Sequence, residues 1–437
     1  MRTVFEKRIP LLLFSFLLVF LYISGIGKVS QTSDFKDYFQ ASQNFRDKKD
    51  LYNLDVLEDL RSEFESGKLD FKDIFQPEVF EKLKARMDNV GAYIYPPTFA
   101  FLLVPISFFP YEVASGIFFT LNFLALLGSL YLISKILHRE NQYLFLSLAV
   151  LLSVRFIENH QNNNQVGLLL LFLILSSVVS KKDWLSGLLL GLAIVIKVTP
   201  AAFLFYFLFK KRYGAIFYTI GFAVLWACLP ALSDPGFTWN MNRTWYELVL
   251  EKYLKSPMLR AWKNNQSLNA TLAKYFLPYS DIMNQGRFGM PFIDLTVFQV
   301  KWIGNLLTLT IAGPYLYKVY KGASEAFVLS GLFFFSVLFS GISWIHAFVF
   351  LIFPAAYILG TVWPKDDSIP KLETWKDKRN RSSFVFLSMS LFILLANRSL
   401  IGSGTEEKLL MFSYLLYTSL IQYFCLFFIS PGDTEKS

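Results

Sequence analysis

The chain has 437 residues, of which 54% are hydrophobic, 18% are aromatic and only 17% are charged. A soluble protein of this length would be covered in apolar surface, so the composition excludes that class and indicates a protein that crosses a membrane several times. The net charge of +9 does not indicate a nucleic-acid partner, because the basic residues collect at the ends of apolar segments rather than along one face.

The first apolar segment runs from Ile9 to Gly27, close to the roughly 20 residues that cross about 30 Å of hydrocarbon. Three basic residues precede it, which places the N-terminus in the cytoplasm and Asp34 on the outer side. A cleaved signal peptide is the alternative, but the segment is long for one and residues 29–31 make a poor cleavage site. We therefore expect a retained transmembrane helix.

Further apolar segments predict an all-α polytopic bundle, with spans near residues 112–137, 142–156, 166–180, 184–209, 213–232, 292–317, 324–341, 345–363, 382–397 and 408–429. The segment 184–209 must supply two passes or a broken pair, and Val198-Thr199-Pro200 offers the break because proline disfavours helix in the residue before it. A shorter piece from Pro97 to Pro110 is either re-entrant or a span. We expect about 11 to 13 transmembrane helices in one domain covering residues 1–437.

The charge of the loops between these segments indicates the side of the membrane on which each loop lies. By the positive-inside rule the basic turns are cytoplasmic, at residues 135–139, 181–182, 210–212, 318–321 and in the loop 364–381. Both termini are then cytoplasmic, and the long loops 28–95 and 233–290 are outer. The first outer loop carries amphipathic helical stretches, which either lie flat in the membrane interface or form a soluble cap on the bundle.

Two charged positions suggest chemistry at the outer surface. Asp34 and Asp37 lie among aromatic residues at the water boundary, where a carboxylate can deprotonate a sugar hydroxyl, although a solvated loop aspartate is the alternative. Lys197 follows an apolar stretch and precedes Thr199-Pro200. A lysine at membrane depth calls for an anion such as a lipid phosphate, unless it snorkels to the headgroups.

Three polar segments also belong to the outer side. The amides of residues 158–165 and 263–269 can hydrogen-bond the hydroxyls of a neutral sugar, or can simply make hydrophilic turns. In the segment 343–346, His346 can bind a hydroxyl or share a proton with a carboxylate, and Trp344 offers a face for a sugar. A satisfied polar histidine at a helix end is the alternative.

Taken in order, six segments resemble the polyprenyl-phosphate-mannose-dependent membrane glycosyltransferases of the GT-C class, glycosyltransferase family 87. The segments are residues 34–38, 93–99 with Pro105 and Pro110, the turn at Gln165, 187–200, 265–268 and 343–346. The resemblance covers most of the chain and implies a GT-C-like bundle. At the turn, the family tends to have Gly-Gln followed by asparagine, whereas this chain reads Asn164-Gln165-Val166-Gly167.

The resemblance implies a role for each matching residue. Asp34 is the catalytic base, with His346 as the second catalytic residue. Lys197 stabilises the departing phosphate and His346 orients the acceptor. The substrate-binding residues are Asp37, Tyr38, Tyr95, Gln165, Lys197, Asn265, Gln266 and Trp344.

The function that we expect is transfer of a hexose, mannose in the family, from a polyprenyl phosphate to a hydroxyl of a glycan or glycolipid, with inversion. The chain has no phosphate-binding glycine loop and no nucleotide-sugar motif, and an outward-facing site cannot use cytoplasmic nucleotide sugars. A lipid-linked donor meets that need. We expect no cofactor and no metal site, membrane lipid as a partner, and a bacterial inner membrane as the location. A flippase of lipid-linked saccharide and a noncatalytic scaffold are the alternatives.

Overall fold

A computed structural model describes residues 2–31, 33–52, 63, 76, 93–251, 263–277, 293–377 and 380–429, and within these ranges the regular elements are all helices. Five helical segments are long and apolar enough to cross a membrane: Arg8–Ile26, Tyr111–Ile136, Tyr143–Asn162, Tyr213–Leu232 and Ile345–Val362. The bent pair Ser403–Met411 and Tyr414–Phe428 makes a sixth if it is one span. The prediction of an all-α polytopic membrane protein is confirmed.

Six further apolar helices within the described ranges are 10–17 residues long: Pro97–Phe108, Gly167–Val179, Asp183–Ile196, Thr199–Phe209, Glu325–Leu338 and Arg381–Leu395. At 1.5 Å per residue, each of these is shorter than the roughly 30 Å hydrocarbon layer. The total of 11 to 13 transmembrane helices therefore stays a prediction. Both amphipathic stretches expected in the first outer loop fall almost entirely outside the described residues.

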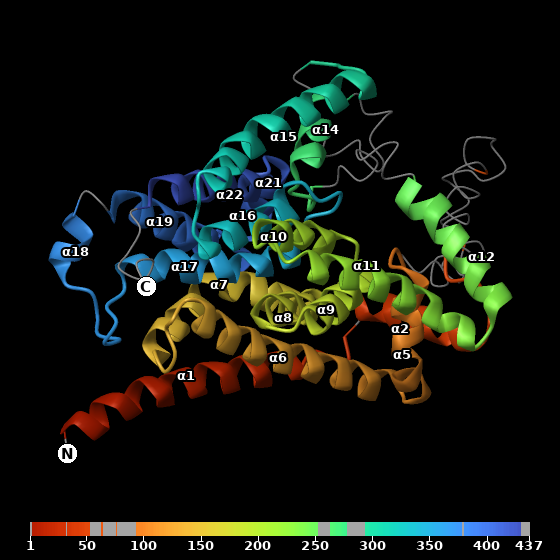
Figure 1. The fold of residues 1–437 in the computed structure, drawn as a ribbon, viewed down its shortest axis with the longest axis horizontal. Helices are drawn as coiled ribbons and strands as arrows, with labels where there is room; N and C mark the ends of the chain where they lie inside the picture. The colour runs from red at the N-terminus through yellow and green to blue at the C-terminus, as the bar shows by residue number, and fades with distance from the viewer. Residues whose placement is uncertain are drawn as a thin grey trace.

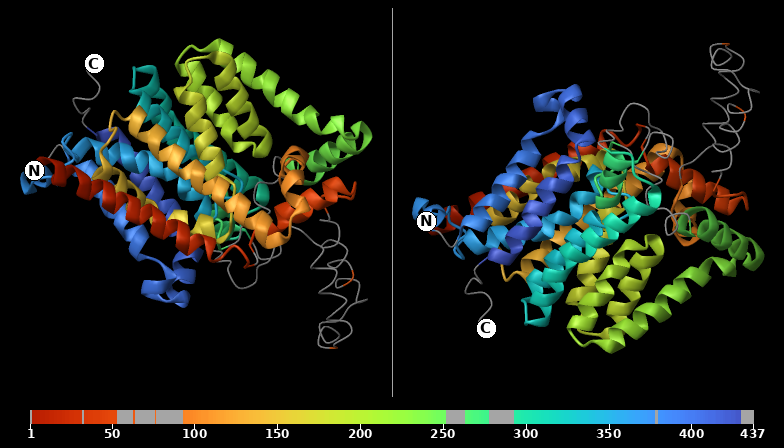
Figure 2. Two further views of the ribbon diagram at one scale, coloured as in Figure 1. Left: turned by 90° about the horizontal axis from the view of Figure 1, so that it is seen from below. Right: turned by 90° about the horizontal axis from the view of Figure 1, so that it is seen from above.

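The helices lie roughly side by side in one bundle (Figures 1 and 2). Helix α1 (Arg2–Ile26) packs against α7 (Tyr143–Asn162), and α6 (Tyr111–Ile136) packs against α8 (Gly167–Val179). On the other side of α8 follow α9 (Asp183–Ile196) and α11 (Tyr213–Cys228). The remaining bundle helices are α15 (Val297–Tyr320), α16 (Glu325–Leu338), α17 (Ile352–Val362), α19 (Arg381–Leu395) and α22 (Tyr414–Cys425).

Shorter helices lie at the two ends of the bundle. Figure 1 places α2 (Phe35–Arg46), α5 (Pro97–Leu103) and α12 (Pro235–Trp245) together at one end, and α18 (Leu372–Lys376) at the other. Helix α5 begins with Pro97, a residue suited to the first helical position because it has no N–H to satisfy. Two further short helices, α14 (Leu268–Phe276) and α21 (Ser403–Met411), pack against α15 and α22 respectively.

Large apolar side chains cover the outside of several helices. On α1 the side chain of Phe16 is 72% exposed, and on α11 that of Phe217 is 75% exposed. On α15, Trp302 and Leu309 are exposed in the same way. Apolar surface of this extent is costly in water but suits contact with lipid, so these faces mark the perimeter of the bundle.

The helical segment 184–209 is interrupted where the sequence predicts a break. Helix α9 ends at Ile196, and Lys197 is extended with φ −153° and ψ 133°. The chain then continues as a 3₁₀ helix, η3 (Thr199–Phe203), and the short α10 (Leu204–Phe209). The span expected at residues 408–429 stays a prediction, and the structure adds a bend within it, because α21 and α22 meet at 62°. Ser413 between them has φ 53°, a left-handed conformation that ends α21.

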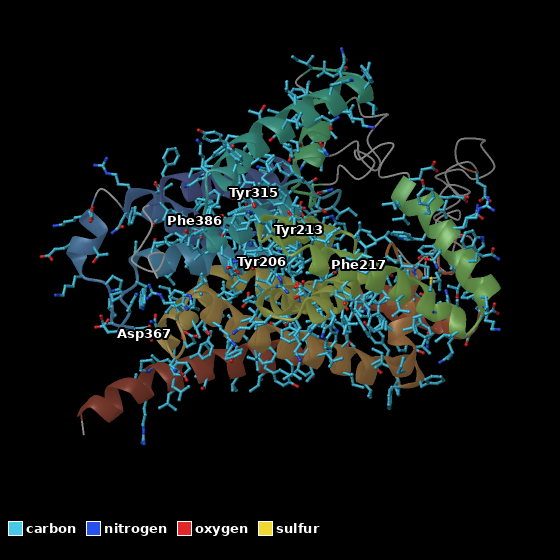
Figure 3. All side chains as sticks on the ribbon, viewed as in Figure 1. Tyr206, Tyr213, Phe217, Tyr315, Asp367 and Phe386 are labelled. Carbon is cyan, nitrogen blue, oxygen red and sulfur yellow. The ribbon has the colours of Figure 1, made fainter. Side chains whose placement is uncertain are left out.

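The basic turns gather at the end of the bundle opposite α2 and α12. Lys210 Nζ lies 2.9 Å from Glu325 Oε2, which joins the α10–α11 turn to the start of α16. Asp367 accepts hydrogen bonds from the amides of Leu144 and Phe145, both 2.9 Å long, so the loop after α17 caps the start of α7. Figure 3 shows Asp367 at this end, far from α12. We refer to it as the basic end.

Candidate active site

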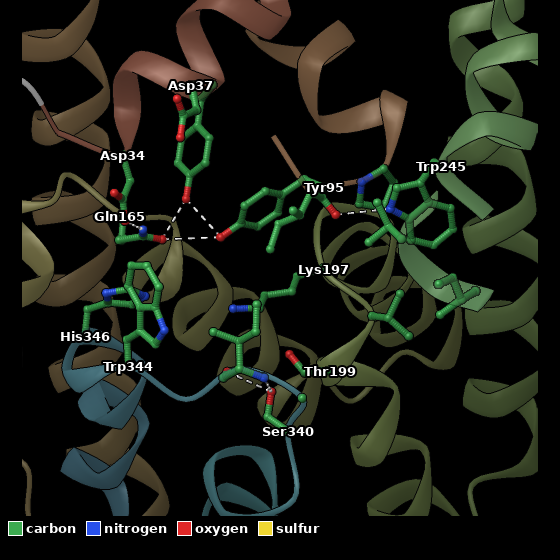
Figure 4. A pocket seen from close by; sticks show the side chains of 18 residues that line it. Asp34, Asp37, Tyr95, Gln165, Lys197, Thr199, Trp245, Ser340, Trp344 and His346 are labelled. Carbon is green, nitrogen blue, oxygen red and sulfur yellow. Dashed lines mark hydrogen bonds between the residues drawn. The ribbon is translucent and has the colours of Figure 1, made fainter. Parts of the chain in front are cut away.

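A cavity of about 260 Å³ opens at the end of the bundle that carries α2, α5 and α12. Its wall comes from α2, the segment before α5, the α7–α8 turn, the break after α9, the π-helical turn η5 (Tyr246–Glu251) and the segment before α17 (Figure 4). Eight of the ten predicted site residues line it: Asp34, Asp37, Tyr38, Tyr95, Gln165, Lys197, Trp344 and His346. Segments more than 300 residues apart in the sequence therefore share one cavity.

Asp34 stands at the N-cap position of α2, which aims its carboxylate at the α7–α8 turn. Gln165 Nε2 donates a hydrogen bond to Asp34 Oδ2. Burial raises the pKa of Asp34 above its usual range, while the hydrogen bond from Gln165 opposes that shift by stabilising the ionised form. A carboxylate with a raised pKa is a stronger base when ionised, which suits proton abstraction.

The orientation of the Gln165 amide follows from its other contacts. Gln165 Oε1 lies 2.6 Å from the Tyr38 hydroxyl and 3.3 Å from the Tyr95 hydroxyl. The two hydroxyls lie 2.9 Å from each other. Since an ionised carboxylate only accepts hydrogen bonds, Nε2 must face Asp34, which leaves Oε1 to accept from the tyrosine hydroxyls. Gln165 thus couples the carboxylate to a fixed aromatic pair, as Figure 4 shows.

The turn that carries Gln165 is held by local contacts. Asn164 adopts φ 44°, a left-handed conformation that asparagine tolerates, and its Nδ2 donates to Ser115 O and Ser115 Oγ at 3.0 Å. His160 Nε2 accepts from the amide of Leu168 at 3.0 Å. Gly167 permits this close approach, because a Cβ there would lie 3.1 Å from the His160 ring. The departure from the family pattern at 164–167 is therefore a self-consistent turn.

Lys197 supplies positive charge to the middle of the cavity. No hydrogen bond or ion pair joins its ammonium group to another of the residues that the structure describes. Its Nζ lies 5.8 Å from the centre of the Tyr95 ring, a cation–π distance. The end of α9 at Ile196 places the Lys197 side chain in the cavity wall (Figure 4). An anionic group bound here would face Lys197 without having to displace another carboxylate.

Trp344 and His346 form the wall below Asp34. Their ring centres lie 5.9 Å apart with the planes at 62°. Trp344 caps the 3₁₀ helix η7 (Ile345–Leu351), which contains His346 and leads into α17. The His346 side chain is 8% exposed. An indole face and an imidazole next to a carboxylate can hold a sugar ring and its hydroxyls.

The structure does not place Asn265 and Gln266 among the residues that line the cavity. Asn265 Nδ2 donates to Gly341 O at 2.9 Å, and its Oδ1 accepts from the amide of Ser343 at 2.9 Å. The backbone N–H of Gln266 donates to Ser343 O at 2.8 Å. Buried Lys274 donates to Asn265 O at 3.0 Å and to Leu410 O. These residues hold the cavity wall from behind.

The sequence analysis missed the apolar end of the cavity. Trp245, Val249 and Leu250 from α12 and η5 line it together with Ile94 and Val198. The Trp245 indole donates to Ile94 O at 3.2 Å, which ties α12 to the segment before α5. The available signal was an apolar and aromatic cluster at 245–250 within a loop expected to be outer. Among the residues described, no group of three His, Cys, Asp or Glu side chains is placed to hold a metal ion.

Comparison with known proteins identifies the family. The sequence profile of Glycosyltransferase family 87 matches residues 93–341, more than half of the chain. The chain belongs to this family. The match includes Tyr95, Gln165 and Lys197, whereas Asp34 and His346 lie outside it.

Two curated proteins are similar to part of this family 87 chain. One is an alpha-(1->3)-arabinofuranosyltransferase of Corynebacterium glutamicum, 31% identical over 158 residues, which are 35% of this chain and 38% of that protein. The other is a polyprenol-phosphate-mannose-dependent alpha-(1-2)-phosphatidylinositol pentamannoside mannosyltransferase of Mycolicibacterium smegmatis, 30% identical over 155 residues, 33% of this chain and 37% of that protein. The chain thus spans under two fifths of each relative. No solved structure matches it.

Proposed function

We propose that this protein is an integral-membrane glycosyltransferase. It moves a hexose, with mannose as the first candidate, from a polyprenyl phosphate to a hydroxyl of a glycan or glycolipid. The transfer takes place on the extracytoplasmic side of a bacterial inner membrane. The observation that carries the proposal is that a half-buried carboxylate and a lysine without an ion pair line one cavity with an apolar end. The mannosyltransferase relative is named as dependent on polyprenol-phosphate-mannose, which supports the donor class.

The proposed reaction uses Asp34 as a general base. The acceptor oxygen attacks the anomeric carbon as its proton moves to the Asp34 carboxylate. The bond from that carbon to the phosphate oxygen breaks, its electron pair stays on that oxygen, and the polyprenyl phosphate leaves. Attack opposite the leaving group inverts the anomeric configuration. Gln165 holds the carboxylate in one orientation, which contributes through positioning.

Lys197 is assigned to the leaving phosphate. Negative charge grows on that phosphate as the bond breaks, and a cation in a cavity shielded from water stabilises it more strongly than one in bulk solvent. Trp245 lies beyond Lys197 from Asp34 (Figure 4), and Val249 and Leu250, which follow it in the chain, line the same cavity. That order, carboxylate, then cation, then apolar wall, fits the sugar, phosphate and lipid of the donor in sequence.

The positions of the basic turns indicate the side of the membrane on which the active-site cavity opens. The basic turns lie at the end of the bundle opposite the cavity, and the positive-inside rule assigns them to the cytoplasm. A donor delivered laterally within the bilayer would reach the cavity at the outer surface. No cofactor is required by this scheme.

The test is transfer of label from radiolabelled polyprenyl-phosphate mannose by membranes containing the protein. A polyprenyl-phosphate arabinofuranose donor is tested in parallel, because one relative is named an arabinofuranosyltransferase. Label from either lipid in a glycan supports a lipid-linked donor. Movement of intact donor across the membrane with no transfer would favour a flippase. Neither transfer nor movement would leave a noncatalytic role.

A further inference from the structure

A second cavity, of about 590 Å³, lies at the basic end of the bundle. It is enclosed by the end of α6 and the turn that follows, the end of α8, the start of α16 and the end of α17. Its lining residues include Lys135, His138, Arg139, Lys181, Glu325 and Tyr357, and apolar side chains at the ends of α6 and α8. Neither the sequence segments of the family nor the proposed reaction uses this cavity.

The charge of this second cavity is positive. Neither Lys135 nor Lys181 forms a hydrogen bond or an ion pair through its ammonium group with any residue that the structure describes. Glu325 is already engaged, since Lys210 lies 2.9 Å away and Tyr206 donates to its other oxygen. Lys135 and Lys181 therefore present positive charge to the cavity that no ion pair among the described residues cancels.

Arg139 gives the cavity a fixed wall. Its side chain is buried, and the guanidinium donates to Gly360 O, to Pro364 O at 3.2 Å and to Gln142 Oε1 at 3.0 Å. These hydrogen-bond acceptors are neutral and hold the group in place, while the carboxylate of Asp367 also acts on the guanidinium electrostatically. A cation held by carbonyl groups at a cavity wall is preorganised for an anion.

Part of the remaining lining is apolar and points to a lipid. Ile136, Val178 and Val179 lie beside the basic groups, at the ends of mainly apolar helices. A lysine at such a helix end places its alkyl chain along apolar surface and its ammonium group at the headgroup level. Free phosphate would leave the apolar wall uncovered, whereas a phospholipid covers both parts.

We propose that this cavity binds the phosphate headgroup of an anionic membrane lipid, with the first carbons of its chains against Val178 and Val179. Basic cavities between helices on the cytoplasmic side are suited to this kind of ligand. The proposal does not depend on which sugar the protein transfers.

Occupancy of this cavity would brace the elements that carry the active site. Helix α8 runs from Gly167, two residues after Gln165, to Val179 in the second cavity. Helix α16 starts in the second cavity and ends two residues before Ser340, and the segment from His346 continues through α17 to Thr361. A lipid at the basic end thus contacts three elements whose other ends form the active-site wall.

The test is native mass spectrometry of the purified full chain, titrated with phosphatidylglycerol, phosphatidylcholine or inorganic phosphate. The variants are Lys135→Gln, Lys181→Gln and their combination, with Lys182→Gln as the matched control because Lys182 is exposed and adjacent but does not line the cavity. At about fivefold in affinity per lysine, the double variant should bind phosphatidylglycerol roughly 25-fold more weakly. The control should bind as the unaltered protein does.

Three results would overturn the proposal. Equal binding of phosphatidylcholine would show that the cavity does not select a headgroup with net negative charge. Equal weakening by Lys182→Gln would show that the lysines act through the general surface charge and not through the cavity. Binding of inorganic phosphate that displaces the lipid at comparable concentration would show a phosphate site instead. A Lys181→Arg variant, which keeps the charge, should bind lipid within about twofold of the unaltered protein, and a melting curve of each variant confirms that it is folded.

Discussion

Asn265 holds the backbone of Ser343 from behind the active-site cavity, with its Oδ1 2.9 Å from the Ser343 amide nitrogen. The same side chain donates to Gly341 O at 2.9 Å. The segment between these contacts and η7 carries Trp344 and His346, which line the cavity. Asn265 therefore shapes the site through the backbone, and its part in the family motif is explained without contact to a sugar.

Replacing Asn265 tests this role. Asn265→Ala removes the partner of three backbone groups, the buried amides of Ser343 and Ser267 and the part-buried Gly341 O. Each buried group left without a partner costs about 1–3 kcal/mol, so both the melting temperature and turnover should fall. Asn265→Asp keeps the acceptor for Ser343 and loses only the donor to Gly341, so its defect should be smaller in both measurements. A variant with normal stability and a raised KM for the donor alone would instead indicate direct substrate contact.

The pH dependence of the reaction reports on Gln165. The base must be ionised to accept a proton, so turnover should rise with pH through the pKa of Asp34, which burial raises above 3.8. The Gln165 hydrogen bond lowers that pKa, so Gln165→Leu should shift the acidic limb of the pH–rate profile to higher pH. An acidic limb that stays in place while turnover falls would mean that Gln165 acts on the substrate.

Lys197 should matter for its charge and its position. Lys197→Met removes the cation from the cavity and should lower kcat/KM for the donor by about two orders of magnitude or more, the scale of a lost electrostatic contact in the transition state. Lys197→Arg keeps the charge in a different geometry and should retain part of the activity. Equal activity in all three proteins would mean that the lysine only reaches toward lipid headgroups.

Topology can be measured with single cysteines, after replacement of Cys228 and Cys425. Ser30 and Ser368 are both exposed and lie at opposite ends of the bundle, next to α2 and next to Asp367 respectively. An impermeant thiol reagent added outside should label Ser30→Cys at once, and Ser368→Cys only after the membrane is opened. Labelling of the two from the reverse sides would place the cavity in the cytoplasm and exclude the proposed donor route.

Sequence patterns predicted the convergence of the cavity for a physical reason. Asp34, Gln165, Lys197 and His346 each follow or precede an apolar segment, so membrane spanning alone brings them to the same end of a bundle. The break at Lys197 was predictable because Pro200 follows it. Side-chain direction was not predictable: nothing in the composition of the 263–269 segment distinguishes an amide that faces a sugar from one that faces a backbone, as Asn265 does.

Other features depend on tertiary contact. The bend at Ser413 rests on a left-handed backbone at a residue that usually avoids it, and the apolar run 408–429 gives no sign of it. Helix α21 is held at its angle partly by the buried ion pair of Arg155 and Glu406, 2.8 Å long, which joins positions 251 residues apart. The apolar end of the cavity likewise forms only when α12 folds against Ile94.

The central claim is that Asp34 is the general base, and the most direct measurement compares sugar transfer by Asp34→Asn and Asp37→Asn at matched protein levels in membranes. Both residues line the cavity, but only Asp34 receives the hydrogen bond from Gln165 Nε2. Loss of a general base typically costs a factor of about 10²–10⁴, so Asp34→Asn should lower turnover by two or more orders of magnitude and Asp37→Asn by far less. The reverse order of the two defects would contradict the account.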